Sequence, residues 1–202
     1  MTRIFKLAAL AALSFSTGSF AQDAPPLGNA ILNAADACEQ AMSGPIRMKY
    51  PAQVFMDTPA HLKAPSFADV PDLVKRFAAT TTGGRLSSDQ TFIRLASQEA
   101  AVWVNVSNGF PFCDVAVIST DGLDHSLPAD LVESLQADGW SLTKTLGVGD
   151  ESAPLFHYSL AKAVPGKESA TRILWIKGMN HPPQGEEGIH LELNMMQGPP
   201  TG

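Results

Sequence analysis

The chain has 202 residues, of which 45% are hydrophobic and 17% charged, and its 20 acidic and 14 basic side chains give a formal net charge of −6. This length suits one domain with a hydrophobic core of its own. The acidic excess argues against nucleic acid and anionic membrane surfaces as partners, and the absence of a long apolar run predicts no transmembrane anchor.

The first 21 residues have the pattern of a secretory signal peptide. Arg3 and Lys6 provide the positive n-region, and Leu7 to Phe15 is a short apolar stretch. Ser19 and Ala21 place small residues at the −3 and −1 positions of a cleavage site. We therefore expect cleavage after Ala21 and a periplasmic or secreted protein. Loss of the leader would leave 12 basic against 20 acidic residues, a formal charge of −8.

Two cysteines, Cys38 and Cys113, lie beyond the predicted cleavage site. In an oxidising compartment an even pair is most simply one disulfide. The two are 75 positions apart, and on the chain-entropy model closing such a loop stabilises a fold by about 4 kcal/mol. A reactive thiol is the alternative, but no Cys-x-x-Cys spacing and no neighbouring base support it.

A single domain is predicted over residues 29–198, after a flexible, proline-bearing segment at 22–28 and before a short tail at 199–202. Apolar residues at helical spacing predict a first helix from an Asn29 cap to Met42, with Cys38 on its buried stripe.

Prolines punctuate the next stretch, residues 45–68, which we expect to run over the surface in extended pieces. A second helix is predicted after an Asp69 cap, with Pro71 in its first turn. Its apolar face would consist of Leu73, Val74, Phe77 and Ala78. A strand is predicted at residues 90–96.

A β-hairpin is predicted around Asn108-Gly109, because this dipeptide suits a two-residue type I′ turn. That turn places Val104 opposite Cys113 and Val102 opposite Val115. One face is then entirely apolar, and consists of Val102, Val104, Val106, Cys113, Val115 and Val117. The other face is mixed, and consists of Trp103, Asn105, Phe112 and Asp114.

A third helix is predicted from about Leu127 to Asp138, with Ser126 as its cap and a Schellman-type end at Gly139 and Trp140. Four strands follow at residues 141–147, 155–161, 171–177 and 189–196. In the last strand alternation places Ile189, Leu191, Leu193 and Met195 on one face, and His190, Glu192, Asn194 and Met196 on the other.

Strands that occur in runs rather than alternating with helices predict an α+β fold. We expect an antiparallel sheet of about six to seven strands packed against two or three helices, with one disulfide. A curved sheet or partial barrel around one helix is the alternative. The order of helix and strands, then helix and strands, also resembles a doubled unit, although no matching residues support an internal repeat.

No stretch carries a recognisable catalytic motif, so no catalytic residue and no cofactor are predicted. The nucleophile elbow Gly-x-Ser-x-Gly is absent. The Thr80–Gly84 stretch lacks the Gly-Lys-Ser/Thr ending of a phosphate-binding loop. Asp121, Asp124 and His125 lack the spacing of an EF-hand, so a polar turn is the simpler interpretation.

The segment from Met179 to Met196 contains thioether and imidazole groups that suit copper. Its candidate ligands are Met179, His181, Glu186, Glu187, His190, Met195 and Met196. Six residues of strand separate His190 from Met196 by about 20 Å, so these two cannot share an ion. Only Met179, His181 and His190 remain, around a loop of unknown path. We therefore predict no stoichiometric metal.

The favoured hypothesis is a non-enzymatic exported binding or envelope-associated protein. Its partner would be a protein or a small apolar ligand, bound on a mixed strand face such as that of Trp103 and Phe112. The alternative is a small exported enzyme, hydrolase-like, with a site that is assembled only in the fold.

Overall fold

A computed structural model describes residues 24–43, 67–81, 90–107, 112–150, 152–167, 170–181 and 185–198. Its helices are α1 (Leu27–Ala41), α4 (Asp72–Thr81) and α5 (Leu127–Ala137), with a 3-10 turn η1 at Phe67–Asp69. Its strands are β1 (Gln90–Leu95), β2 (Ala101–Ser107), β3 (Phe112–Ser119), β4 (Ser141–Leu146), β5 (Leu155–Ala163), β6 (Thr171–Met179) and β7 (Gly188–Gly198).

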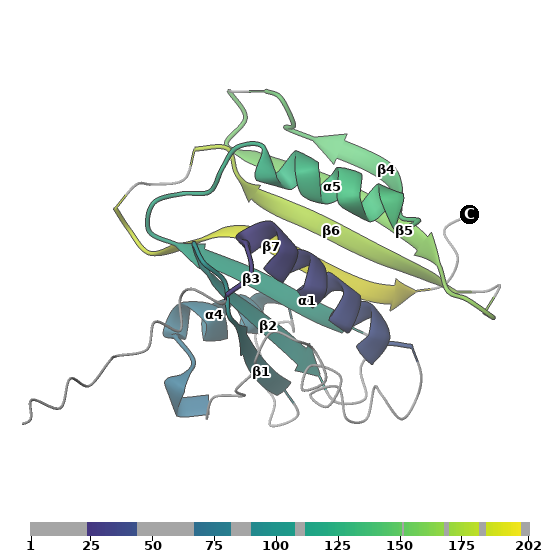
Figure 1. The fold of residues 1–202 in the computed structure, drawn as a ribbon, viewed down its shortest axis with the longest axis horizontal. Helices are drawn as coiled ribbons and strands as arrows, with labels where there is room; N and C mark the ends of the chain where they lie inside the picture. Colours follow the sequence, from purple (N-terminus) through teal and green to yellow (C-terminus); the bar gives the residue numbers. More distant parts are fainter. Residues whose placement is uncertain are drawn as a thin grey trace, which may run out of the picture.

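The strands form one antiparallel sheet in the order β1-β2-β3-β7-β6-β5-β4. The predicted α+β class and sheet are therefore confirmed. Helices α1 and α5 lie side by side in front of the sheet, and α4 lies behind it (Figure 1). The first half contributes β1–β3 and the second β4–β7, each as a meander, and the halves meet where β3 pairs with β7. The strands are thus arranged as two successive meanders, which corresponds to the doubled order seen in the sequence.

The main core lies between the sheet and the pair α1 and α5. All six residues of the predicted apolar hairpin face belong to it: Val102, Val104, Val106, Cys113, Val115 and Val117. A smaller cluster lies on the opposite side, where Val74, Phe77 and Ala78 of α4 pack with Trp103 and other residues of β1–β3. Trp103 is therefore covered, and its part of the mixed face is not free to bind a partner.

The helix ends differ in part from the prediction. Helix α1 begins at Leu27, not after an Asn29 cap, because Leu27 is buried and the Ala30 amide bonds the Pro26 carbonyl. Ala24 is buried too, within the segment predicted to be flexible. Helix α4 begins at Asp72, after a separate turn that contains the predicted Asp69 cap.

The predicted end of the third helix is confirmed. Gly139 has a φ of +87°, and the amide of Trp140 bonds the carbonyl of Leu135 at 3.0 Å. At the start of α5, Ser126 makes no side-chain capping bond, and its hydroxyl donates to Asp130 instead.

The predicted hairpin register is wrong by two residues. Val104 lies opposite Val115 and Val106 lies opposite Cys113. A shift of two leaves every side chain on its predicted face, so the burial pattern cannot distinguish the two registers. Four residues, 108–111, separate the two strands, and this turn lies outside the described residues. So do the predicted signal peptide, the stretch 45–66, the end of the Thr80–Gly84 segment and the tail.

The predicted disulfide joins α1 to β3. Cys38 and Cys113 are bonded, with their Cα atoms 5.6 Å apart, and both are buried. The next residue of the helix, Glu39, accepts hydrogen bonds from Lys162 on β5 and from the buried Arg172 on β6. Among the described helices, none is long and apolar enough to span a membrane.

The disulfide generates a stability prediction. Replacing both cysteines, Cys38→Ser with Cys113→Ser, is expected to lower the free energy of unfolding by about 4 kcal/mol, because the 75-residue separation is then unconstrained in the unfolded chain. Urea unfolding of the oxidised protein and the double variant measures the difference. Thiol titration of the denatured, unreduced protein should find about none, and two titratable thiols would contradict the bridge.

Candidate functional site

A β-bulge changes the faces of β7 near its start. Val117 pairs with Leu191 and Ile118 with Ile189, so His190 is an extra residue on β7. Ile189 consequently packs with the α4 cluster, whereas Leu191 lies in the main core. The predicted grouping of Ile189 with Leu191 is therefore wrong. Bulges recur beside functional sites, where they redirect a side chain.

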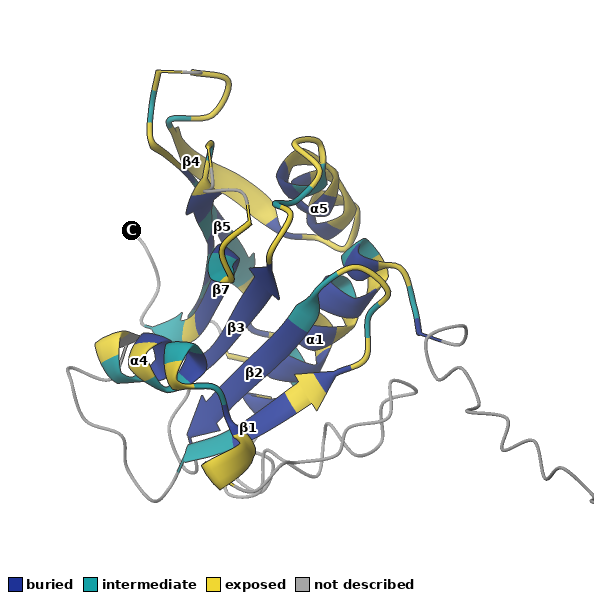
Figure 2. Ribbon diagram, turned by 90° about the vertical axis from the view of Figure 1, so that its left-hand side faces the viewer, coloured by how far each residue is buried: buried dark blue, intermediate teal, exposed yellow. Residues whose placement is uncertain are grey.

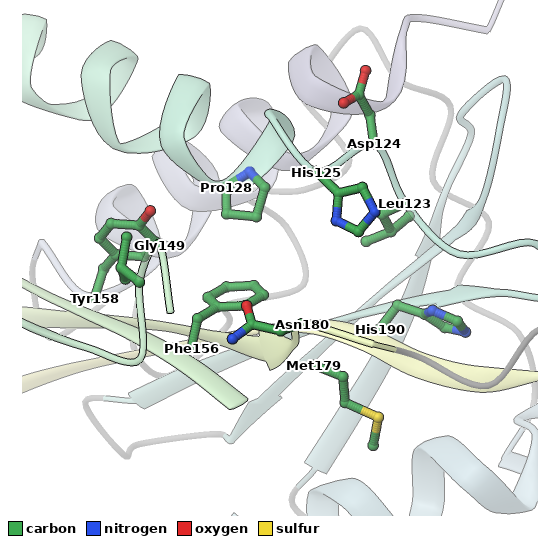
Figure 3. Close-up of a pocket in the computed structure, with 11 residues that line it drawn as sticks. Leu123, Asp124, His125, Pro128, Gly149, Phe156, Tyr158, Met179, Asn180 and His190 are labelled. Atoms are coloured by element: carbon green, nitrogen blue, oxygen red, sulfur yellow. The ribbon is translucent and has the colours of Figure 1, made fainter. Parts of the chain in front are cut away.

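His190 forms part of the wall of a pocket at one end of the sheet, with its imidazole directed away from Pro128 and Phe156 (Figure 3). Described residues of three loops meet there: 123–125 after β3, 148–150 between β4 and β5, and 180–181 after β6. We call it the loop-end pocket. Its apolar lining is Leu123, Pro128, Val148, Phe156 and Met179, and its polar lining is Asp124, His125, Tyr158, Asn180 and His190. The inner cavity has a volume of about 100 Å³.

A wider hollow of about 490 Å³ adjoins this cavity and shares His125, Gly149 and Asn180 with it. Asp150 and His181 complete the lining of the hollow. The two stretches that were weighed separately as ion sites, around His125 and around His181 and His190, therefore meet at one end of the fold.

The carboxylates of this region are engaged in their own turns. Asp124 accepts a hydrogen bond of 2.9 Å from the Ser126 amide, and Asp150 accepts from both the amide and the hydroxyl of Ser152. These bonds lower the pKa of both carboxyl groups, so both stay ionised at neutral pH. The Asp124 carboxylate points away from the cavity in Figure 3.

The other candidate metal ligands are dispersed. The side chain of Met179 points away from His125 and Pro128 (Figure 3). Met195 is buried in the main core, and Met196 lies exposed farther along β7. Glu186 and Glu187 are exposed and line neither hollow. Within the described ranges, no three His, Cys, Asp or Glu side chains are arranged to hold a metal ion.

Asn180 organises the loops and was missed in the sequence. Its side-chain amide lies 3.1 Å from the carbonyl of Gly147, 3.3 Å from that of Asp150 and 2.8 Å from that of Ala153. Gly147 is required beside it, since its φ is +67° and an added Cβ would collide with the carbonyl oxygen of Leu155. The sequence signal that could have identified this role is the position of the asparagine directly after β6.

His190 is the chemically notable group of the pocket. It is 4% exposed, and its Nδ1 is buried without a hydrogen-bond partner in the structure as described. A buried polar atom left unpaired costs about 1–3 kcal/mol. Neither hollow has a serine, threonine or cysteine in its lining, so the arrangement offers hydrogen bonding to a small molecule rather than one of these nucleophiles.

No family model, no curated protein and no solved structure matches the chain. The function is therefore inferred from the geometry of the site.

The role of Asn180 can be tested with an isosteric change. In Asn180→Asp a carboxylate would face the carbonyls of Gly147, Asp150 and Ala153 without a proton to donate. We expect faster amide hydrogen exchange in residues 147–154 and little change in the exchange of β2 and β3. Unchanged exchange in the 147–154 loop would contradict the anchoring role.

The prediction on metal remains to be measured. Because no three described ligands converge, calorimetric titration with Cu(I), Cu(II) or Zn(II) should show no stoichiometric submicromolar binding. A one-to-one isotherm that is lost in both His181→Ala and His190→Ala would overturn this.

Proposed function

We propose that the protein is an exported, non-enzymatic binding protein and that the loop-end pocket receives a small ligand. The observation that carries this proposal is the bulge in β7, which brings His190 to the pocket wall with a buried nitrogen unpaired. A ligand that bonds this nitrogen would recover the free energy that its burial costs. The pocket also combines an apolar lining with a few polar groups, as ligand sites generally do.

The ligand best suited to this lining is a small neutral alcohol or phenol. A hydroxyl group can donate to an imidazole nitrogen or accept from it, so it fits either tautomer of His190. Leu123, Pro128 and Phe156 offer apolar contacts to a hydrocarbon body. A carboxylate ligand is disfavoured, because Asp124 and Asp150 remain ionised nearby. A cavity of about 150 Å³ holds benzene, so the inner cavity and its open hollow suit a ligand of roughly this size.

Export is the second part of the proposal. It is supported by the signal-peptide pattern of residues 1–21 and by the disulfide, which persists in oxidising compartments. The periplasm or the extracellular space is the proposed location. A small exported enzyme is the less favoured alternative, because the pocket linings contain no serine, threonine or cysteine.

Phenol, toluene and benzoate are matched probes of the pocket. We expect phenol to shift the amide NMR signals of residues 123–128 and 188–191, with toluene and benzoate binding more weakly. In His190→Leu, phenol should bind about three- to tenfold more weakly, the equivalent of one lost hydrogen bond.

His157→Leu is the control for this experiment. The Nε2 of His157 is also buried without a partner, but His157 lies on the other side of the sheet, so its variant should bind phenol as the unaltered protein does. Equal affinity for phenol and toluene, or full affinity in His190→Leu, would refute the assigned role of His190. Absence of binding by all three probes would refute the pocket as a site for such ligands.

A further inference from the structure

In the part of the chain that the structure describes, a helix covers only one half of the side of the sheet opposite α1 and α5. There α4 packs Val74 and Phe77 against residues of β1–β3, among them Trp103. Over β4 and β5 no helix lies on that side in Figure 2, and the described contact of α4 with β7 is at Ile189, near the start of that strand. We call the β4–β7 part of this side the open face.

Apolar side chains gather on the open face. The strand register places Leu146, His157, Lys177 and Glu192 in one row across β4–β7, and Lys144, Ser159, Trp175 and Asn194 in the next. Leu155 pairs with Met179 beyond the first row. Four of the seven large hydrophobic residues exposed in the described chain lie here: Leu146 at 63%, Leu155 at 58%, Met179 at 43% and Met196 at 38%. Apolar patches of this kind mark interaction surfaces.

Two lysines, one on β4 and one on β6, lie on the open face. Lys144 on β4 is exposed, and Lys177 on β6 lies over the Trp175 ring and donates to Asn194. Burial, and then the charges of Lys177 and Lys144, lower the pKa of His157 between them. The carboxyl groups on this side lie farther in: Glu192 is half-buried on β7, and Asp114 is buried on β3.

On the same side of the sheet, the β1–β3 half is covered by helix α4. Each meander carries one tryptophan on this side of the sheet, Trp103 on β2 and Trp175 on β6. Trp103 is 5% exposed beneath α4, whereas Trp175 is only partly buried. Pairing of a further strand with the edge strand β4 is disfavoured. The register of β4 is irregular between Leu142 and Lys144, and an irregular register and an edge lysine each discourage edge pairing.

We propose that the open face is a docking surface for an amphipathic helix of a partner protein, whose apolar stripe covers Leu146, Leu155 and Trp175 and whose flanking carboxylates meet Lys144 and Lys177. This interaction is independent of the loop-end pocket. The charge of the face selects an acidic helix, and its apolar area provides the affinity.

Two stapled helical peptides of about 15 residues, with the same leucine stripe but flanked by glutamate or by lysine, test the proposal. The glutamate peptide should shift the indole signal of Trp175 and the amides of β4–β6, and the lysine peptide should bind at least about tenfold more weakly. Equal binding of the two peptides, or no binding of the glutamate peptide, would overturn it.

Matched variants separate the face from general effects. Leu146→Ser should weaken binding of the glutamate peptide about tenfold, whereas Leu142→Ser, on the same strand but on the helix side, should not. Lys144→Glu should weaken it about two- to fivefold, whereas Lys167→Glu, at the exposed β5–β6 turn, should not. Circular dichroism confirms that each variant is folded.

Two other occupants are outcomes of the same experiments. If phosphatidylglycerol vesicles rather than the glutamate peptide bind at β4–β6, the surface recognises lipid and the proposal is wrong. If the same signals move with protein concentration in the absence of peptide, the occupant is a second copy of this chain, which likewise overturns it.

Discussion

Two adjacent residues of α1 are bonded to the two halves of the sheet, which are also joined where β3 pairs with β7. Cys38 is bonded covalently to Cys113 on β3, in the first half, and Glu39 accepts hydrogen bonds from Lys162 and Arg172 in the second. Arg172 is 2% exposed, and a buried guanidinium without a carboxylate partner is strongly destabilising. One turn of helix therefore couples both meanders near the starts of β3 and β6, at the opposite end of these strands from the loop-end pocket.

The distribution of helices follows from the same arrangement. Because α1 and α5 share one side of the sheet, six of its strands, β1–β3 and β5–β7, present apolar residues to a single core. The other side receives only α4 in the described chain, over β1–β3. The β4–β7 part of that side has exposed leucine and methionine side chains beside lysines. Such a mixture is unusual both for a solvent-exposed sheet face and for a closed core.

The sequence predicted the elements well because each produces a strong periodic signal. Alternation located the strands, and Gly139 with Trp140 located the end of α5. The hairpin register was wrong because a shift of two preserves every face. Ile189 was assigned to the wrong face because a bulge interrupts alternation without a sequence signal, and Asn180 was missed because its three carbonyl partners come from a separate loop.

Two sets of buried polar groups, the network around Asp114 and His190, have different roles in this fold. Asp114 is buried, yet it accepts hydrogen bonds from Asn105 and from Asn194, whose carbonyl in turn accepts from Lys177. This network links β2, β3, β6 and β7, and none of its residues lines the loop-end pocket, although Oδ1 of Asn105 is also buried without a partner. His190 differs, since the fold uses a bulge to place it at a pocket wall and leaves Nδ1 without a partner. His190 rather than the Asp114 network defines the candidate site, because His190 lines the pocket and a ligand that bonded its unpaired nitrogen would stabilise that nitrogen.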